Sequence, residues 1–578
     1  MARSNDDAAE MLREFAELLA ISGGPDCKVR VYEKAARSVA GYPADIAELD
    51  EKALRKIPDV GSHTARKILE YFDTGSVGEL TTLRKQVPPG LRTLVTVPGL
   101  GPKHAHQVYE ELGITSVDGL LHALHEHRLR ELRGWGEKSE DNLARSLREA
   151  HSAGGRVQLG YALDLASQLL YRISGLPQVR LAAYAGSLRR MRDTVGDIDL
   201  LVAAVDAEPI MADVAGLPMV ARVLAHGPTK TSVLTTTGVQ VDVRVVDPSV
   251  WGAAMLYFTG SKPHNIQVRE LAVRAGLKLS EYGLFDVATG RLIVAETEEE
   301  VYQRLGLPWI PPTLREGTGE VEAALEGRLP SLADIGDIRG DLHTHTDLTD
   351  GVASLTEMVA AAKKHRYEYY AITDHAPLLW MQRMTTEKAL EQRRRIRALE
   401  RTAGITLLHG TELNIQPDGS LDWDEEFLST FDIVVASVHS RFRQSREEMT
   451  ARVLRAIEHP CVHVIGHPTG RLIGSRPPVD LDHDAVFRAA ARTGTALEIN
   501  SSPERLDLDG DLVRRARHFG VRFAVSTDAH AVPHLDYLRF GVATAQRGWA
   551  GPDDVINTYS EARLRRFLRE KSRALTRR

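Results

Sequence analysis

Cysteine is almost absent from this chain of 578 residues, which carries only Cys27 and Cys461. The two lie far apart and no CxxC pair occurs, so we expect neither disulfides nor a thiolate zinc site, and we expect a reducing compartment. No run of about 18 apolar residues is present, so no membrane span is expected. The stretch MARSNDDAAEM at the start lacks an apolar core, so no secretory signal is expected.

An excess of basic residues is also missing. The formal net charge is −6, so any binding of nucleic acid has to rest on local features. Apolar residues make up 43% of the chain and charged residues 26%, a balance typical of globular proteins. A chain of this length is expected to form about three to five domains.

Residues 1 to about 150 predict helices joined by short, glycine-bearing turns. A weak repeat occurs there: IPDVGSHTARKILEYF from Ile57, VPGLGPKHAHQVYEEL from Val97 and a rougher LRGWGEKSEDNLARSL from Leu132. In each copy a glycine turn precedes an amphipathic helix, and glycine lets backbone N–H groups approach a phosphate. The repeat predicts helix-hairpin-helix units, which bind nucleic-acid backbone without reading bases. A glycine-capped helical turn is the alternative for any single copy.

The middle of the chain changes to alternating strands and helices, and it carries three aspartates. Asp197 and Asp199 lie two apart in GDIDLLVA, so both carboxylates point to one face of a strand. In VQVDVRVV the valines form one face and Asp242 lies on the other. Such carboxylates on adjacent strands could hold two Mg²⁺ ions, which clamp the attacking and leaving oxygens of a phosphoryl transfer. For the DID motif alone, an exposed acidic strand is the alternative.

These motifs resemble a known family. The run GSLRR…GDIDLL…VDVR…YFTGSKPHN is similar to the palm and thumb of the family X DNA polymerases, over about residues 5–315. The resemblance implies that two Mg²⁺ or Mn²⁺ ions are bound by Asp197, Asp199 and Asp242. It implies that the nucleotide is bound by Gly186, Ser187, Arg190, Tyr257, Phe258, Gly260, Ser261, Lys262 and Asn265. It also implies DNA contacts at Val60, Gly61, Leu100, Gly101 and Arg269.

Three positions bear on how far the resemblance extends. Gln240 stands where animal members carry an arginine that orients the third aspartate, so the metal geometry is expected to depend on other partners. Lys262 replaces an acid near the nucleotide base, as in the bacterial branch. Lys67 occupies the position of the family's Schiff-base lysine, with Tyr32 and Lys28 at supporting positions, so deoxyribose-phosphate lyase activity is an open expectation. A solvated surface lysine is the alternative.

After Gly340, seven apolar strand candidates share one property, which is that each ends in potential ligands. Those ligands are His343 and His345, Asp374 and His375, Glu412, His439, His467, Glu498 and Asn500, and Asp528 and His530. Helical stretches separate most of the strands, and this alternation predicts a βα-barrel with its active site at the C-terminal ends of the strands. No single histidine would indicate a metal site, but potential ligands at the ends of seven strands are not expected by chance.

The same residues resemble the PHP (polymerase and histidinol phosphatase) domain, over about residues 338–578. The resemblance implies up to three metal ions, bound by His343, His345, Asp350, His375, Glu412, His439, His467, Asp528 and His530. Imidazole and carboxylate ligands without thiolate suit Mn²⁺, Zn²⁺ or Fe. Asp350 stands where some relatives have histidine, which favours a harder metal such as Mn²⁺.

Together these features predict a multidomain α+β protein with helical helix-hairpin-helix domains, a nucleotidyltransferase palm and thumb, and a distorted seven-stranded βα-barrel. The expected boundaries are 1–80 and 81–154 for the helical domains, 155–248 for the palm, 249–316 for the thumb, 317–337 for a linker and 338–578 for the PHP domain. The Pro/Gly-rich stretch LPWIPPTLREGTGE, from Leu307 to Glu320, suggests the linker.

The predicted function is a bacterial cytosolic DNA polymerase that fills short repair gaps and trims 3′ ends as a metal-dependent 3′–5′ exonuclease. The barrel's activity as a 3′-phosphatase or abasic-site endonuclease is left open. Expected partners are gapped or nicked duplex DNA and dNTPs, with no membrane, and the expected state is a monomer. Two alternatives are a small-molecule phosphatase tethered to a DNA-binding module and a non-catalytic DNA-end binding protein.

Overall fold

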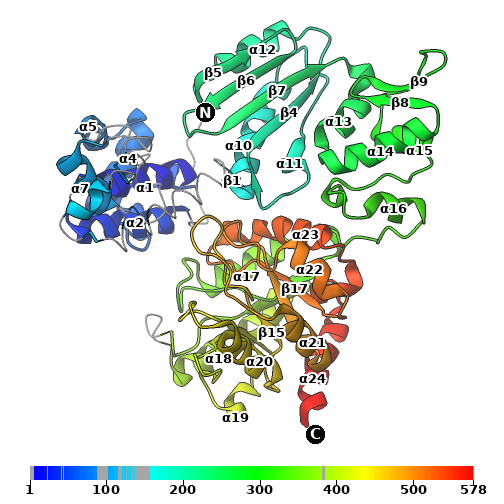
Figure 1. Ribbon diagram of the computed structural model, residues 1–578. Helices are drawn as coiled ribbons and strands as arrows, with labels where there is room; N and C mark the ends of the chain where they lie inside the picture. Colours follow the sequence, from blue (N-terminus) through cyan, green and yellow to red (C-terminus); the bar gives the residue numbers. More distant parts are fainter. Residues whose placement is uncertain are drawn as a thin grey trace.

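The computed structural model describes residues 5–576 except 23, 41, 43–44, 87–99, 101, 115–119, 121–122, 125–126, 133–134, 137–139, 141–142, 144–155 and 380–383. Gly101 and most of the predicted turn before it therefore lie outside the described residues. Figure 1 shows a helical N-terminal part (blue), a palm built on a sheet, a thumb (green) and a C-terminal barrel (yellow to red). Within the described residues, no helix has both the length and the apolar character needed to cross a membrane.

The N-terminal part consists of short amphipathic helices around one apolar core. The helices are α1 (Asn5–Ile21), α2 (Asp26–Ala40), α3 (Glu51–Leu54), α4 (Ser62–Thr74), α5 (Gly78–Gln86) and α7 (Pro102–Leu112). In α1 the buried residues Leu12, Phe15 and Ala16 recur at helical spacing and face this core. Helix α4 begins after Gly61 and ends at Gly75, whose φ of 82° is the left-handed cap that favours glycine.

The palm is a five-stranded sheet in the order β2-β4-β7-β6-β5. Its elements are α10 (Leu159–Ser174), β2 (Leu181–Tyr184), α11 (Gly186–Arg189), β4 (Asp197–Ala203), α12 (Glu208–Ala215), β5 (Val220–His226), β6 (Lys230–Thr235) and β7 (Gln240–Val246), and a short pair joins β1 (Val157–Gln158) to β3 (Thr194–Val195). Alternate β4 residues such as Ile198 and Leu200 share a core with α10 and α12. The other face of β4 carries Asp197, Asp199 and Leu201, as the period of a strand requires.

The thumb follows the palm and ends in the segment predicted as a linker. Its elements are α13 (Trp251–Thr259), α14 (Lys262–Arg274), the sheet of β8 (Leu277–Ser280), β9 (Gly283–Asp286) and β10 (Leu292–Val294), and α15 (Glu298–Arg304). The linker carries a helix, α16 (Glu320–Leu325), which packs on the thumb. Glu320 is buried there against His264, with Oε1 2.8 Å from Nδ1. This buried pair and the apolar face of α16 attach the segment firmly to the thumb.

The C-terminal domain is a parallel seven-stranded sheet in sequence order, closed by a bridge between Thr344 and Ala529. Its strands are β11 (Gly340–Asp341), β12 (Tyr369–Ile372), β13 (Thr406–Asn414), β14 (Ile433–Ser437), β15 (Val464–Ile465), β16 (Ala496–Asn500) and β17 (Phe523–Ser526). Its helices are α17 (Leu355–Lys364), α18 (Thr386–Ala403), α19 (Glu425–Leu428), α20 (Arg446–Glu458), α21 (His483–Thr493), α22 (Gly510–Arg517), α23 (Leu538–Arg547) and α24 (Glu561–Thr576). The predicted fold class is confirmed.

Two layers of apolar side chains build this barrel. Alternate strand residues such as Leu408, Val435 and Ala524 form the inner layer, which also contains Leu564 and Leu568 from α24. The intervening residues pack outward against the helices. Because side chains alternate along a strand, Glu412 points into the barrel like Leu408, which lies four residues earlier on β13. The inner layer therefore continues into polar groups at the C-terminal end of the barrel.

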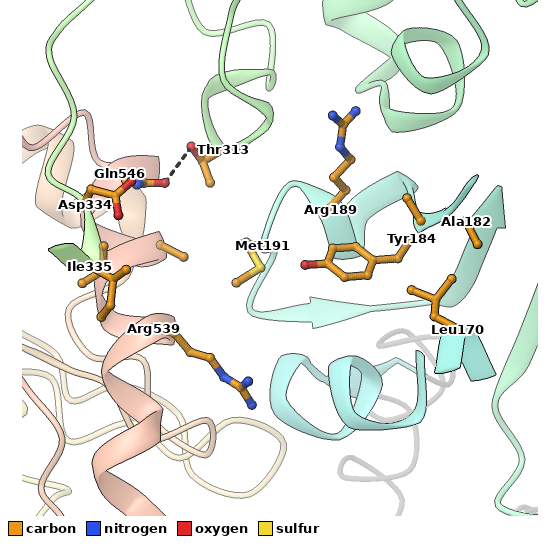
Figure 2. Close-up of a pocket in the computed structure, with 13 residues that line it drawn as sticks. Leu170, Ala182, Tyr184, Arg189, Met191, Thr313, Asp334, Ile335, Arg539 and Gln546 are labelled. Carbon is orange, nitrogen blue, oxygen red and sulfur yellow. Dashed lines mark hydrogen bonds between the residues drawn. The ribbon is translucent and has the colours of Figure 1, made fainter. Parts of the chain in front are cut away.

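The palm and the barrel share an apolar boundary. Leu506 and Phe540 of the barrel domain are buried in the core of the palm. Beside this boundary lies a cavity of about 530 Å³ between β2 of the palm and α23 of the barrel. Figure 2 shows Tyr184 and Met191 on the palm side of the cavity and Arg539 on the barrel side.

Candidate active sites

The three palm aspartates come together on β4 and β7. These strands are parallel neighbours with Asp199 directly opposite Asp242. Ligand atoms of Asp197, Asp199 and Asp242 all lie within 4.8 Å of one another. Burial, followed by the charges of Asp197 and Asp242, raises the pKa of Asp199 to about 7. Carboxylates so close together repel one another unless cations neutralise them, which is the arrangement expected of a two-metal site.

Asp242 is held by several neighbours, of which the sequence analysis named Gln240 but not Lys230. Lys230 Nζ lies 2.6 Å from one carboxylate oxygen, and Gln240 Nε2 donates to the other at 2.9 Å. Burial would raise the pKa of Asp242, but the hydrogen bonds from Lys230, Gln240 and Ser232 hold it below its usual range. Gln240 thus contacts the third aspartate although it is not an arginine, and Lys230 on β6 is the additional partner.

The glycine–serine turn lies directly against this carboxylate cluster. Gly186 has a φ of 59°, and a Cβ there would come 2.1 Å from Asp199 Oδ2. Only glycine fits this approach. Ser187 follows within α11, and Arg190 comes just after it. The Arg190 guanidinium donates to Thr259 O at 2.6 Å and to Glu316 Oε1 at 3.1 Å.

The other predicted nucleotide-binding residues lie at the junction of α13 and α14. Tyr257 and Phe258 stack edge to face with ring centroids 5.1 Å apart, near the end of α13. Gly260 and Ser261 form the turn, and Ser261 caps α14 at His264 N. Asn265 Nδ2 donates to Tyr257 O at 2.8 Å, and Arg269 follows one turn later. Lys262 begins α14 and is exposed, whereas Gly260 and Ser261 before it are buried.

In the N-terminal part, the predicted DNA-binding and lyase residues lie around α4. Gly61 is exposed at the start of the helix, with nothing within 4 Å of the position that a Cβ would take, whereas Val60 and Leu100 are buried. The Lys67 ammonium pairs with Glu79 and lies 5.0 Å from the Phe15 ring centroid. Burial lowers the pKa of Lys67, but the hydrogen bonds and charges of Glu79 and Tyr32 together outweigh burial, so the pKa is raised. The predicted supporting residues differ, since Tyr32 is buried near Lys67 and Lys28 is exposed.

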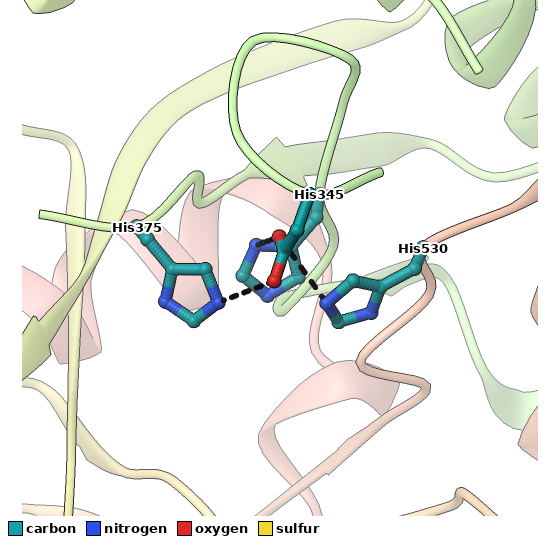
Figure 3. Close-up of side chains that lie close together, drawn as sticks. His345, His375 and His530 are labelled. Carbon is teal, nitrogen blue, oxygen red and sulfur yellow. Dashed lines mark ion pairs between the residues drawn. The ribbon is translucent and has the colours of Figure 1, made fainter. Parts of the chain in front are cut away.

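All nine predicted barrel ligands gather at the C-terminal ends of the strands. One group contains His345, Asp350, His375 and His530, a second His343, His345 and Asp528, and a third His375, Glu412 and His439. Figure 3 shows the rings of His345, His375 and His530 of the first group close together. Asp350 Oδ2 lies 3.2 Å from His375 Nε2, and its Oδ1 lies 3.4 Å from His530 Nε2. His467 joins through Nε2, which lies 3.1 Å from Glu412 Oε1.

Glu412 lies at the centre of this cluster. Its oxygens lie within 2.9 Å of His375 Nδ1, 3.1 Å of His439 Nε2 and 3.4 Å of His343 Nε2. Burial alone would raise the pKa of Glu412, but the surrounding imidazoles, His439 first, hold it well below its usual range. The carboxylate is therefore charged in the middle of a buried group of histidines.

The ring of His345 tests whether metal ions fit here. The side chain is fully buried, and among the described residues neither ring nitrogen makes a well-aligned hydrogen bond, although Nε2 lies 3.1 Å from Asp528 Oδ1. A buried imidazole without a well-aligned partner is costly, and a bound metal ion would satisfy it. The ligands are imidazoles and carboxylates, a set that divalent transition metals accept. The chemistry of the residues thus fits the predicted metal centre.

Several residues support the nine ligands, and of these the sequence analysis named Asp374 and Glu498 only as potential ligands at strand ends. Glu498 Oε1 lies 2.7 Å from His343 Nδ1, and Asn414 Oδ1 lies 2.8 Å from His439 Nδ1. Such contacts orient ligand imidazoles. Asp374 accepts hydrogen bonds from the backbone and hydroxyl of Thr346 and so fixes the loop after β11. Their positions at strand ends were the available signal, but the sequence does not separate ligands from their supports.

Comparison with known proteins gives matches along the whole chain. Family models match residues 3–77 (helix-hairpin-helix domain), 91–149 (SAM-like helix-hairpin-helix tandem), 254–316 (DNA polymerase beta thumb) and 341–502 (PHP domain). The chain is 36% identical over 567 residues to the DNA polymerase/3′-5′ exonuclease PolX of Bacillus subtilis (strain 168), which covers 97% of this chain and 99% of that protein.

The barrel alone is also similar to smaller proteins. A probable phosphatase of Thermoanaerobacter sp. (strain X514) is 29% identical over 248 residues, which is 41% of this chain and 96% of that protein. A probable phosphatase of Photobacterium profundum is 33% identical over 207 residues, covering 33% of this chain and 77% of that protein.

Proposed function

The chain belongs to the PolX family, and from this premise we propose that it fills short gaps in DNA and trims 3′ ends during repair. It is a DNA-directed DNA polymerase with a metal-dependent 3′–5′ exonuclease. The observation that carries both activities is that one chain holds two separate clusters of potential metal ligands, one in the palm and one in the barrel. We also propose the domain boundaries predicted above, a monomer on DNA, and the bacterial cytosol as its location.

In the palm, the residues divide the work of nucleotide addition. Asp197, Asp199 and Asp242 would hold two Mg²⁺ or Mn²⁺ ions, which supply charge for the reacting oxygens of the 3′ hydroxyl and the triphosphate. The turn at Gly186 and Ser187 offers a backbone N–H and a hydroxyl to the phosphates. Arg190 supplies a positive charge once it exchanges Glu316 for phosphate. Tyr257 and Phe258 would pack against the sugar, and Asn265 would contact the base.

In the barrel, the nine ligands would hold up to three ions of Mn²⁺, Zn²⁺ or Fe, which activate water and neutralise the phosphate oxygens when bound. Glu498 and Asn414 keep the imidazoles oriented. Burial of His343, His345 and Glu412 keeps bulk water from the ligand atoms. We propose Mn²⁺ as the metal in the cell because Asp350 adds a hard oxygen donor.

A second candidate activity has a specific observation behind it. The barrel matches phosphatase relatives over nearly their whole length. A site that cleaves phosphodiesters at a 3′ end could also remove a terminal 3′ phosphate, since both reactions attack the same kind of phosphorus. We propose 3′-phosphatase activity as an additional activity of the barrel on DNA. Abasic-site cleavage remains a further candidate reaction at this site.

One assay tests the proposed function. A labelled primer on a gapped template is incubated with the full chain and Mn²⁺, with and without dNTPs. With dNTPs the primer should lengthen to the end of the gap, and without them it should shorten from its 3′ end. A primer that stays unchanged under both conditions would refute the proposal. A primer that carries a 3′ phosphate, run in parallel, tests the phosphatase activity.

The hairpin at Gly61 gives a prediction about DNA affinity. Gly61→Val should raise the Kd for gapped DNA by about 10-fold, because the side chain would push the phosphate away from the backbone N–H groups and a hydrogen bond to a charged group is lost. The exposed glycine has open space around it, so the fold should tolerate the change. Gly101→Val should act similarly at the second hairpin. Gly113→Val, after α7 in the same part of the chain, is unsuitable as a control because its φ is positive.

A better control lies at the other end of α4 from Gly61. Ser76→Val, in the exposed turn after α4, adds a comparable side chain outside the hairpin. Fluorescence anisotropy with labelled gapped DNA measures the wild type and the variants. Equal affinities for wild type and both glycine variants would show that the hairpins do not bind the phosphates.

The pairing of Lys67 gives a prediction about lyase activity. A Schiff base needs a neutral amine, and Glu79 is among the groups that raise the pKa of the Lys67 ammonium. Borohydride trapping on DNA with a 5′-deoxyribose phosphate should therefore be weak near pH 7 and increase as the pH rises. Glu79→Gln should increase trapping at a given pH, and Lys67→Ala should remove it. Trapping that is equal in wild type and Lys67→Ala would assign the reaction to another residue.

A further inference from the structure

The loop after β16, residues 501–509, lies between the barrel's ligand cluster and the palm. On the palm side, Leu506 is buried in the palm core. Pro503 packs closely on Gly160 of α10, because a Cβ added at Gly160 would lie 2.7 Å from the Cβ of Pro503. On the barrel side, Arg505 Nε lies 3.7 Å from Asp528 Oδ2. The loop therefore connects the two domains at the level of the metal ligands.

Arg505 is a charged group of this loop whose bonding is incomplete within the described residues. Its side chain is 21% exposed, yet Nη1 is buried and has no hydrogen-bond partner there. A buried guanidinium N–H that bonds to nothing is costly. An anion that enters the site would satisfy it.

The neighbouring Arg471 shows what a structural arginine looks like at this boundary. Its Nε donates to Arg505 O at 2.7 Å, and its Nη2 lies 2.7 Å from Asp193 Oδ2 of the palm. Arg471 thus fixes the backbone of Arg505 and ties it to the palm. These contacts involve the backbone of Arg505 and not its side chain.

A purely structural role for Arg505 is poorly supported by its distances. Asp528 already accepts a hydrogen bond from Asn500 Nδ2 at 3.1 Å and lies 3.1 Å from His345 Nε2. At 3.7 Å, Arg505 is beyond hydrogen-bond range of this carboxylate. Asp528 is therefore oriented without it.

We propose that Arg505 binds the phosphodiester cleaved in the barrel, donating from its free nitrogens to the non-bridging oxygens, and that the palm holds it in position. A guanidinium matches phosphate geometry, and such donors gain strength as charge develops on these oxygens. The inference rests on the proposed nuclease function. It adds to the metal ligands a substrate-binding residue whose backbone depends on the other catalytic domain.

The test uses a small phosphodiester, so that DNA binding elsewhere in the chain does not contribute. The full chain with Mn²⁺ is assayed on the p-nitrophenyl ester of thymidine 5′-monophosphate, and bound metal per chain is measured by elemental analysis. Arg505→Ala should lower kcat/KM by about 10- to 100-fold, the worth of a hydrogen bond to a charged group. Its metal content should match the wild type. Arg505→Lys should lie between the two, because it restores the charge without the fork of donors.

Two controls make the result specific. Arg394→Ala removes an exposed arginine of α18, 74% exposed and paired with Glu391, and should leave kcat/KM unchanged. Millimolar guanidinium ion should partly restore Arg505→Ala, which a folding defect would not allow. Thermal unfolding of each variant shows whether it is folded, and Arg505→Lys keeps the test valid if Arg505→Ala unfolds.

Failure of the proposed role of Arg505 can be told apart from failure of the nuclease function. If the wild type neither hydrolyses the ester nor trims DNA, the proposed nuclease function fails and the inference fails with it. If the wild type is active and His345→Ala is not, the function stands. In that case the inference alone is overturned by a folded Arg505 variant with wild-type kcat/KM, or by one whose metal content falls in step with its activity.

Discussion

Asp197→Ala should lower nucleotide addition by about 10³-fold or more, since the charge stabilisation supplied by two metal ions is worth several kcal/mol and each 1.36 kcal/mol is tenfold in rate. The variant removes one of three carboxylates whose ligand atoms lie within 4.8 Å of one another. It also removes a charge that raises the pKa of Asp199, so Asp199 should experience less repulsion, and Asp199 and Asp242 alone should bind cations more weakly. Primer extension on gapped DNA with Mg²⁺ measures the loss.

Trimming of the same primer should persist in Asp197→Ala, because all nine barrel ligands lie outside the palm. Asp213→Ala is the matched control, since Asp213 is an exposed aspartate on α12 of the same domain, and it should extend primers like the wild type. Loss of both activities in a folded Asp197→Ala protein would contradict two independent sites.

His345→Ala should have the opposite effect and remove most 3′ trimming while extension continues. His345 is shared by two groups of ligands, and in the described part of the chain its ring nitrogens make no well-aligned hydrogen bond. Losing a direct ligand should therefore cost more than the about 10- to 100-fold typical of residues that only support ligands. The metal content of the purified protein should fall as well.

The control for this variant is a histidine of the same barrel that lies outside the cluster. His518, at the exposed end of α22, hydrogen-bonds to Arg514 O, and His518→Ala should trim and bind metal like the wild type. Circular dichroism shows that both variants are folded. Normal trimming by a His345→Ala protein that has lost metal would separate the nuclease from this cluster.

The parts of the sites that could be predicted from sequence are those that follow a local pattern. Two aspartates with strand spacing share a face wherever they lie in a sheet, and polar residues at successive strand ends meet when the strands close into a barrel. This is why Asp197, Asp199 and the barrel histidines were identified. Glu412 was found in the same way, although its central place among five histidines depends on the closed barrel.

The parts that could not be predicted arise between distant segments. Lys230 reaches Asp242 from the next strand, and Glu316 holds Arg190 across 126 positions. The expected linker is tied down by the buried pair of Glu320 and His264, which no local composition signals. Lys67 matched a reactive position, yet Glu79, twelve residues away, pairs with its ammonium and helps to raise its pKa. Partners of this kind depend on tertiary packing, so only the structure identifies them.

The burial of Leu506 and Phe540 in the palm bears on how such a chain can change during evolution. The barrel supplies part of the polymerase's own apolar core, so deleting it would leave a hole where large side chains had been. A lineage that no longer needs the nuclease could therefore lose it either by point substitutions or by deletion of the domain. Replacing ligand histidines leaves the shared core of Leu506 and Phe540 intact, whereas losing the domain does not. We expect such descendants to keep the barrel as a scaffold after its chemistry has gone.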